Sequence, residues 1–487
     1  MAKRNLVLPG NPRYQPVSLV PYFGYDNLVH SWIWVESALL KALADIGYLP
    51  DDAEAALRLR GRAGWQTHLE SCITTTKVDY REKTAKRRTK HDIRALVLLM
   101  QENLPPELRR WVHFGATSFD IRDTAAIIDF KAAYQKVTAP TVRKLALAIA
   151  AKTEEFAGKI QIGRTHGQHA LPITVGFWLA TILNRLMTAG RNLEFDSLSL
   201  VGKFSGAVGA HNAQIGLGIE KKYQEWRSGK SLPDTFEAFV LAKLGLKPAA
   251  VSTQILPPEP LSRFLYSYFQ LSAVLAQLGN DGRNLQRTEI AEVMEVFEKG
   301  QTGSSTMAHK RNPITFENTA GIFKIVKAEF LKVMDCMTSD HQRDLVDSSV
   351  MREFPGIVVL VQYQLESLLR LIPKMVVDPE ALKRNFQLSA NVILAEPIYL
   401  ALILGGYRGD AHKFVNHTLT PRAKESGNQI IVELEKMARR SQTLQKVLEN
   451  IPKDVLRLLH DPREYVGSAS AEALRIASGA HTQFSEH

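Results

Sequence analysis

The sequence predicts an all-α protein, and three observations carry that prediction. Apolar residues recur at three-to-four spacing through long segments, as in amphipathic helices. The alternating pattern of half-buried strands is scarce, and helix-breaking glycines and prolines gather in a few short segments. The chain has 487 residues, of which 45% are hydrophobic and 23% are charged. That length and composition are sufficient for a large helical core, and they exclude a disordered or collagen-like chain.

The helical segments fall into three blocks. The first contains the amphipathic stretch Trp32–Leu43 and ends beyond the breaker at 103–107. The second holds the longest helical runs, among them the segments around 145–150 and 177–186, and prolines and glycines interrupt it between 229 and 260. We therefore expect an N-terminal helical domain, a central bundle of long helices and a C-terminal helical domain, with the bounds 1–113, 114–372 and 373–487.

Net charge and amino-acid composition indicate which binding partners and which cellular compartment to expect for the protein. The net charge of +11 favours anionic partners. The densest basic cluster, Lys83–Arg94, lacks interleaved aromatic residues, so a solvated basic face is preferred over a nucleic-acid surface. The apolar tract 390–404 is too short to span a bilayer, no signal peptide is seen, and Cys72 and Cys336 lie far apart. We expect a cytoplasmic protein with no nucleic-acid or membrane partner.

Three polar, glycine-containing islands interrupt the apolar helices. The first is His113–Asp120, in which Thr117 and Ser118 precede a helical run. Small hydroxyl side chains at a helix start cap the helix, and they can also bind an anion there. Taken alone, capping is the preferred interpretation.

The second island is Gly163–His169, followed by Pro172, which we expect to open a helix. His166 is a candidate general acid or base. A structural or surface role is the more frequent one for a single loop histidine. No acidic ligand accompanies His166 and His169, so we do not expect a metal site.

The third island is Gly303–Pro313. Its glycine and serines indicate a loop with exposed amides, and Asn312-Pro313 is typical of a helix start. Lys310 and Asn312 are donors of the kind that hold a carboxylate, and Glu317 falls in the first helical turn, where a negative charge is favoured. A capped surface loop remains the alternative interpretation. A Ser–Lys hydrolase is disfavoured because no GxSxG elbow is present.

Together the islands resemble the three signature regions of the fumarase/aspartase superfamily, and the whole set is most similar to the adenylosuccinate lyase family. The third island is similar to the superfamily's signature loop, although Ala308 stands where that loop has proline. Five further segments are similar to that family, and the resemblance covers nearly all the chain. These segments are Arg13-Tyr14, Thr89–Asp92, Ser252–Gln254, Gln342–Arg352 and Leu394–Pro397.

The resemblance implies a carbon–nitrogen lyase that releases fumarate by β-elimination. Such an enzyme needs a base for the proton beside a carboxylate, donors for the dianionic intermediate, and an acid for the departing nitrogen. By resemblance, Ser304 is the base and His166 is the acid. Lys310 and Asn312 hold the carboxylates, and Glu317 orients His166.

The resemblance also implies a succinylated purine nucleotide as the substrate, the reaction of purine biosynthesis that yields AMP, and a second substrate of the same pathway. No cofactor and no metal are implied. The expected phosphate and ribose ligands are Arg13, Tyr14, Ser348 and Arg352. The residues expected to line the rest of the site are His91, Asp92, His113, Thr117, Ser118, Gln254 and Arg343. Arginine suits bidentate recognition of a phosphate or carboxylate.

The resemblance implies a homotetramer in which the central domains of the four subunits form a twenty-helix core. Each active site is then shared by three subunits. The richly apolar second block fits this arrangement, although a large monomer with buried central helices remains an alternative. Three other functions remain open. They are a lyase for another succinyl-amine of the argininosuccinate or secondary-metabolic kind, a carboxymuconate cycloisomerase, and a catalytically silent binding or structural relative.

Overall fold

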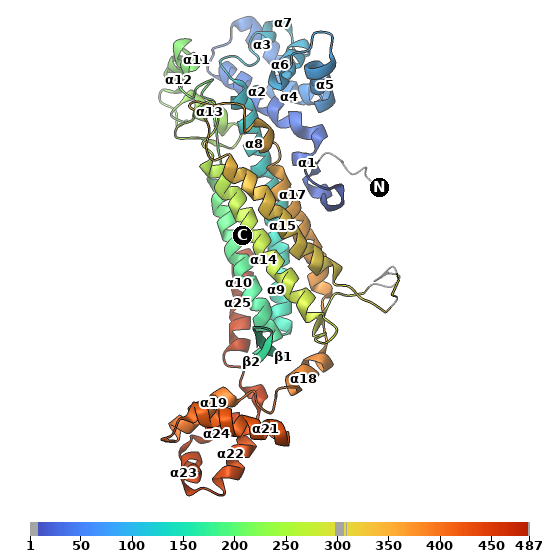
Figure 1. Cartoon of the computed structure of the whole chain (residues 1–487). Coiled ribbons are helices and arrows are strands. Elements are labelled where there is room, and N and C mark those ends of the chain that lie inside the picture. Colours follow the sequence, from blue (N-terminus) through green and yellow to red (C-terminus); the bar gives the residue numbers. More distant parts are fainter. Residues whose placement is uncertain (1–7, 298–305, 308, 486–487) are drawn as a thin grey trace. The chain divides into compact units, whose positions relative to one another are not determined.

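Helices dominate the computed structural model, which describes residues 8–297, 306–307 and 309–485 (Figure 1). Contacts divide the chain into two compact units, each made of three segments. Unit 1 contains residues 1–142, 189–273 and 321–366, and unit 2 contains residues 143–188, 274–320 and 367–487. A division by contacts does not report independent folding, so the three blocks drawn from the sequence remain a prediction.

The boundaries between the units fall within five long helices. These are α9 (Ala139–Glu155), α10 (Val175–Leu198), α14 (Glu259–Leu285), α15 (Ile314–Asp335) and α17 (Pro355–Leu371). Two helices expected from apolar spacing are thereby confirmed, because 145–150 lies in α9 and 177–186 lies in α10. Among the described residues, no helix is both long and apolar enough to cross a membrane.

Unit 1 combines its parts of the long helices with shorter helices near the start of the chain. The amphipathic stretch 32–43 lies in α2, as expected. Helix α2 contacts α8 through a 2.9 Å hydrogen bond from Ser31 Oγ to Asp129 Oδ2. The elements wholly in unit 1 are α1 (Val20–Phe23), α2 (Leu28–Asp45), α3 (Asp51–Arg58), α4 (Gly61–Cys72), α5 (Thr75–Asp79), α6 (Asp92–Glu102), α7 (Pro106–Arg109), α8 (Ser118–Ala133), β3 (Val201–Gly202), α11 (Asn212–Gly216), α12 (Ile219–Arg227), α13 (Phe236–Ala242), β4 (Lys247–Pro248) and α16 (Ser348–Met351). Strands β3 and β4 pair in parallel.

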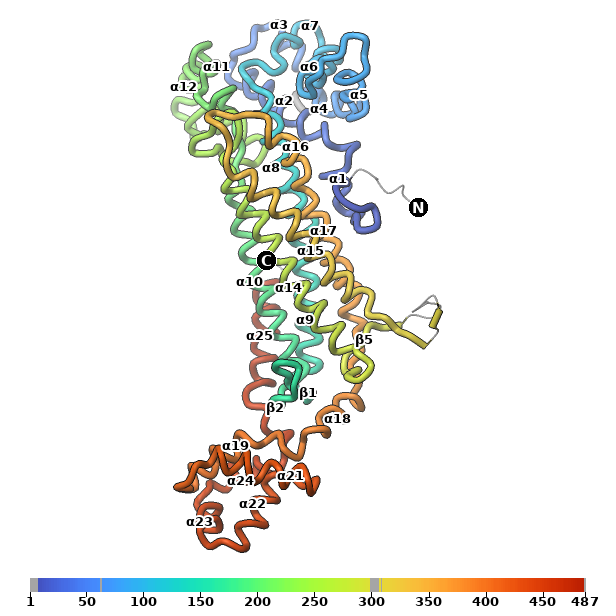
Figure 2. Tube along the Cα trace, in the orientation of Figure 1, coloured from blue at the N-terminus to red at the C-terminus, as the bar shows by residue number. Residues whose placement is uncertain are grey.

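Aromatic and polar contacts join α14, α15 and α17 within unit 1, where these helices lie side by side (Figures 1 and 2). The ring of Phe269 on α14 packs against Phe323 and Phe330 on α15, with centroid separations of 5.5 and 5.4 Å. Helix α14 also donates a 2.6 Å hydrogen bond from buried Ser272 to Gln364 of α17. A buried polar pair of this kind fixes the register of two apolar helices, since sliding would leave both groups unpaired.

Unit 2 contains the C-terminal helices and a hairpin. The elements wholly in unit 2 are β1 (Ile160–Thr165), β2 (Gln168–Thr174), β5 (Val293–Met294), β6 (Val376–Val377), α18 (Pro379–Gln387), α19 (Ala395–Leu404), α20 (Ala411–Phe414), α21 (Thr420–Ser426), α22 (Ile430–Ala438), α23 (Gln442–Asn450), α24 (Lys453–His460) and α25 (Ala469–Phe484). The small residues Ala180 and Ala473 let α25 pack closely beside α10 (Figure 2). Both two-stranded sheets of unit 2, β1–β2 and β5–β6, are antiparallel.

The expectation that Pro172 opens a helix is wrong. Pro172 lies in strand β2, where it pairs in register with Ile162, and α10 begins only at Val175. A two-stranded hairpin has free edges, so the missing N–H of a proline is tolerated there. The second island is therefore a β-hairpin between two long helices.

Candidate active site

The β1–β2 hairpin presents His166 at its tip. His166 and Gly167 form the turn, and both have positive φ angles, +54° and +73°. A two-residue hairpin turn of this hand requires left-handed backbone at both positions. Glycine adopts it freely, whereas histidine does so only at a cost. The imidazole of His166 is exposed, so the turn holds the candidate acid clear of its own strands.

Buried Glu292 anchors this hairpin. Its carboxylate accepts hydrogen bonds from Arg164 at 2.6 and 3.0 Å and from Gln161 at 2.8 Å. Asn385 of α18 donates to the same carboxylate at 2.8 Å. The side chain of Glu292 is fully buried, so removing one partner would leave a buried charge short of hydrogen bonds. This network was not visible in the sequence, because Glu292 and Arg164 are far apart along the chain.

The third island leads into α15. Ser304 and Ala308 lie outside the described residues. Lys310 and Glu317 are exposed, and Glu317 occupies the first turn of α15 as expected. Helix α15 begins at Ile314, one residue beyond Pro313, and the carbonyl of Asn312 accepts a 2.9 Å hydrogen bond from the Ile314 amide.

Two contacts fix the start of α15 within unit 2. Glu295 accepts a 2.7 Å hydrogen bond from the amide of Phe316, and burial raises the pKa of Glu295. The ring of fully buried Phe316 lies against Gly282 of α14, where an added Cβ would be 2.5 Å from a ring carbon. Glycine at 282 is therefore required for this packing distance.

Within the described part of this single chain, no hydrogen bond links His166 to Glu317. The expected orienting contact is thus not made inside one subunit. The resemblance assigns each site to three subunits, so this pair stays a prediction that concerns an assembly.

In unit 1, the first island forms the start of α8. Thr117 is the N-cap, and a capping box joins it to Asp120, as the Thr–Ser pattern predicted. The Asp120 carboxylate is fully buried and ion-paired with the fully buried Lys203, and it also accepts a 3.1 Å hydrogen bond from the Ser205 amide. This buried pair holds the segment that carries Thr117 and Ser118 in a fixed position.

His113 belongs to a separate contact. Its Nδ1 lies 2.6 Å from Oε1 of buried Glu36, and its backbone φ of +63° is in the left-handed region. Burial alone would lower the pKa of His113, but the hydrogen bond and the charge of Glu36 outweigh it, so the net pKa is raised. His113 therefore favours the imidazolium form.

Several of the expected substrate ligands lie together in unit 1. His91 caps α6 through Nδ1, which accepts from the Arg94 amide at 3.3 Å. In the neutral ring, Nε2 then carries the proton, and it lies 3.2 Å from Ser118 Oγ. The neighbouring Asp92 pairs with Arg352 at 2.9 Å. Burial alone would raise the pKa of Asp92, but Arg122 and Arg352 hold it below its ordinary value.

Arg343 completes this group. It donates a 2.5 Å hydrogen bond to Ser348 Oγ, and its guanidinium carbon lies 3.9 Å from the ring centroid of Phe119. Its Nη1 is buried without a hydrogen-bond partner among the described residues. A buried guanidinium nitrogen with no acceptor is suited to an anionic ligand. The unit 1 cluster is defined here as His91, Asp92, Ser118, Arg343, Ser348 and Arg352.

Besides His113, Thr117 and Asn312, three further expected ligands lie outside the unit 1 cluster. Arg13 is exposed in a 3-10 turn, and Tyr14 packs its ring edge on Tyr363 at 5.2 Å. Gln254 is half-buried in the loop before α14, and its amide makes no hydrogen bond to the described residues. That loop is anchored through Ser252, whose Oγ lies 2.6 Å from Ser205 Oγ.

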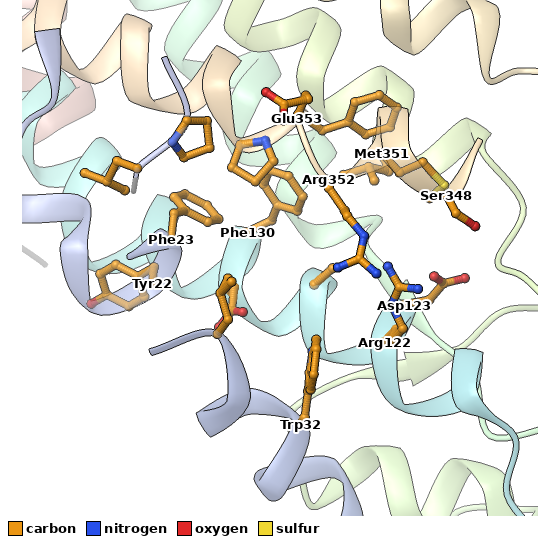
Figure 3. Close-up of a pocket in the computed structure, with 18 of the residues that line it drawn as sticks. Tyr22, Phe23, Trp32, Arg122, Asp123, Phe130, Ser348, Met351, Arg352 and Glu353 are labelled. Carbon is orange, nitrogen blue, oxygen red and sulfur yellow. The ribbon is translucent and has the colours of Figure 1, made fainter. Parts of the chain in front are cut away.

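A cavity of about 450 Å³ adjoins the unit 1 cluster (Figure 3). Its walls are mostly apolar and include Phe23, Trp32 and Phe130. Ser348, Arg352 and Arg122 line one part of it. Arg122 and Phe119 were not singled out from the sequence, although Arg122 lies four residues after Ser118 on one helix, a spacing that was a usable signal. Among the described residues, no group of three or more His, Cys, Asp or Glu side chains is arranged to hold a metal ion.

Comparison with known proteins identifies the family of the chain. The model of a lyase family matches residues 20–327. The solved structures that resemble the chain include 3-carboxy-cis,cis-muconate lactonizing enzyme from Pseudomonas putida and fumarate lyase from Mesorhizobium sp. BNC1. Both have a TM-score of 0.78, with 24% and 22% identity, and cover 97% and 96% of this chain and 98% of their own. At these identities the likeness shows the fold, and the family match shows that the chain belongs to the lyases of the fumarase/aspartase superfamily.

The sequence relatives narrow the family. The adenylosuccinate lyase of Archaeoglobus fulgidus is 31% identical, over 97% of this chain and 98% of its own. That of Pyrococcus horikoshii is 32% identical over 95% of each, and that of Bacillus subtilis is 30% identical over 85% of this chain and 88% of its own. The chain is therefore a member of the adenylosuccinate lyase family, as its motifs predicted.

Proposed function

We propose that this chain cleaves adenylosuccinate to AMP and fumarate by β-elimination. Its similarity over nearly the whole chain to adenylosuccinate lyases carries the proposal. The unit 1 cluster supports it, because Arg343 and Arg352 present guanidinium groups beside Ser348 and suit a phosphate. The carboxamide ribotide with the same succinyl group is proposed as a second substrate, since the bond cleaved is of the same kind.

The roles of the side chains follow from what the reaction requires. The proton to be removed lies beside a carboxylate and is weakly acidic, so a base and stabilisation of a dianion are both needed. Ser304 is proposed as the base, with Lys310 and Asn312 holding the succinyl carboxylates. His166 protonates the departing nitrogen, and its exposed position at the hairpin tip leaves it accessible to substrate.

The active site is proposed to form in a homotetramer. Exposed apolar side chains on the long helices of unit 1 support this, including Leu198 on α10, which is 71% exposed, and Met334 on α15, which is 58% exposed. Large apolar side chains of this kind on neighbouring helices mark surfaces that bind other chains. In such an assembly, His166 of one subunit would meet Glu317 of another.

A substrate panel tests the proposed reaction. Purified protein is incubated with adenylosuccinate, argininosuccinate or carboxymuconate, and fumarate or lactone is quantified. Fumarate release from adenylosuccinate alone is expected. A preference for argininosuccinate or carboxymuconate would overturn the proposal, and an inactive but folded tetramer would favour a binding role.

A further inference from the structure

Arg122 is an arginine beside the unit 1 cluster, and the proposed function gives its side chain no role. It lies on α8, and its side chain is only 17% exposed. Among the residues that the structure describes, its side chain makes no hydrogen bond, and its ion pair with Asp92 is long, at 3.8 Å. A guanidinium carries five N–H donors, and burying them without acceptors is unfavourable. The donors of Arg122 are therefore available to a ligand.

Phe119 holds this guanidinium in place. It precedes Arg122 by three residues on α8, so the two side chains share a helix face. The guanidinium carbon of Arg122 lies 5.2 Å from the centroid of the buried Phe119 ring, and that of Arg343 lies 3.9 Å from it. One aromatic ring thus contacts two arginines, an arrangement that orients both planes.

Asp92 links Arg122 to a third arginine. Its carboxylate contacts Arg122 at 3.8 Å and Arg352 at 2.9 Å, and Figure 3 shows the two guanidinium groups close together at one part of the cavity. Burial lowers the pKa of Arg122, and the positive charges of Arg352 and Arg343 lower it further against the opposing effects of Asp92 and Asp123. A bound anion would relieve both effects, because it would pair the charges that now repel.

We propose that Arg122 is a further phosphate-binding residue of the substrate site and that Phe119 is the residue that positions it. This inference rests on the proposed function for the identity of the substrate. Arg122, Arg343 and Arg352 then bind one dianionic phosphate, with Ser348 as an additional donor. Three guanidinium groups select a phosphorylated substrate over its nucleoside, since the nucleoside leaves their donors unpaired.

The test compares Arg122→Gln and Arg122→Lys with the matched control Arg227→Gln. Arg227 is also a partly buried arginine of unit 1, 25% exposed, but it pairs with Asp234 outside the cluster. Losing charged hydrogen bonds to phosphate is expected to raise the KM for adenylosuccinate roughly 10- to 100-fold in Arg122→Gln. The kcat should change little, and Arg122→Lys should restore part of the affinity. With succinyladenosine, which lacks the phosphate, wild type and Arg122→Gln should have similar kcat/KM.

The role of Phe119 is tested by the same comparison of KM with kcat. Phe119→Leu removes the ring but keeps an apolar side chain, so a rise in KM for adenylosuccinate without a fall in kcat is expected, and Phe119→Tyr should retain wild-type KM. Equal losses on both substrates for Arg122→Gln, or a KM unchanged from wild type, would overturn the inference.

Failure of the proposed function would be recognised separately. If wild-type protein does not cleave adenylosuccinate, inorganic phosphate is used as the probe in thermal unfolding. A phosphate-dependent rise in Tm that is lost in Arg122→Gln but kept in Arg227→Gln supports the anion site without the reaction. The same rise in all three proteins would contradict it.

Discussion

His113 shows how one buried contact sets the charge of a histidine. Glu36 raises the pKa of His113, so the imidazolium is favoured in the folded chain. A raised pKa adds stability that is fully present below the unfolded value of about 6.5 and is lost as pH rises through the folded value. The contribution of this pair to stability is therefore expected to fall as pH rises through the folded pKa of His113.

The variant His113→Asn isolates this charge. Asparagine tolerates the left-handed backbone and keeps an N–H donor, but it does not ionise in this range. The Tm of wild type should exceed that of the variant most at pH 5.5, below the unfolded pKa of about 6.5, and progressively less as pH rises through the folded pKa. A difference in Tm that is constant from pH 5.5 to 9 would show that Glu36 does not raise the pKa of His113.

His166 offers a second test at the residue scale. His166→Asn preserves the positive φ of the hairpin turn but removes the proposed acid. The kcat is expected to fall by roughly 10²- to 10⁴-fold, as for the loss of a general acid, with little change in Tm. Steady-state kinetics and thermal unfolding measure the two quantities. A kcat within about threefold of wild type would remove His166 from the proton transfer.

At the scale of elements, the contact between α14 and α15 positions the third island. Gly282→Ala would place a methyl group against the ring of Phe316 and push the start of α15 away. Overpacking of this kind costs about 1–3 kcal/mol. Since Lys310, Asn312 and Glu317 lie at or just before the start of α15, we also expect a lower kcat.

Gly479→Ala is the matched control, because Gly479 lies within α25 and an added Cβ would meet only the end of Met187, at 3.6 Å. It should be neutral or stabilising by up to about 1 kcal/mol, as expected for alanine in a helix. Chemical denaturation of both variants measures the difference. Equal stability of Gly282→Ala and wild type would show that Phe316 does not limit the separation of α14 and α15.

Some of the helices and strands could be predicted from sequence patterns, and others could not. Helices α2 and α10 were predicted by apolar spacing, and the start of α8 was predicted by Thr117. The β1–β2 hairpin was missed because its turn is a His–Gly pair and Pro172 resembles a helix start. Its stability depends on Glu292, a partner distant in sequence, and no local pattern reports such a contact.

Some residues of the candidate site could also be predicted from the sequence, and others could not. Motifs identified Asp92, Ser348 and Arg352. In the structure Asp92 pairs with Arg352, and Ser348 lies in the same unit 1 cluster, where it accepts a hydrogen bond from Arg343. Arg122 and Phe119 escaped notice, because their relevance depends on packing between α8 and segments far away in sequence. The role of Ser304 remains a prediction, since that residue lies outside the described part of the chain.

For the whole molecule, the proposed active site forms only in an assembly of several subunits. If His166 and Ser304 of one site come from different subunits, mixing two inactive variants restores some intact sites. Co-expression of His166→Asn with Ser304→Ala should regain about one quarter of wild-type activity if subunits mix at random. Each variant expressed alone is the control. Mixed tetramers with no more activity than the separate variants would place both residues of a site in one subunit.

The most direct test of the central claim is a spectrophotometric assay of purified protein with adenylosuccinate. We expect stoichiometric AMP and fumarate from wild type, and no detectable turnover from a Ser304→Ala variant of unchanged oligomeric state. A folded, tetrameric wild-type protein that releases no fumarate from adenylosuccinate would contradict the proposed reaction.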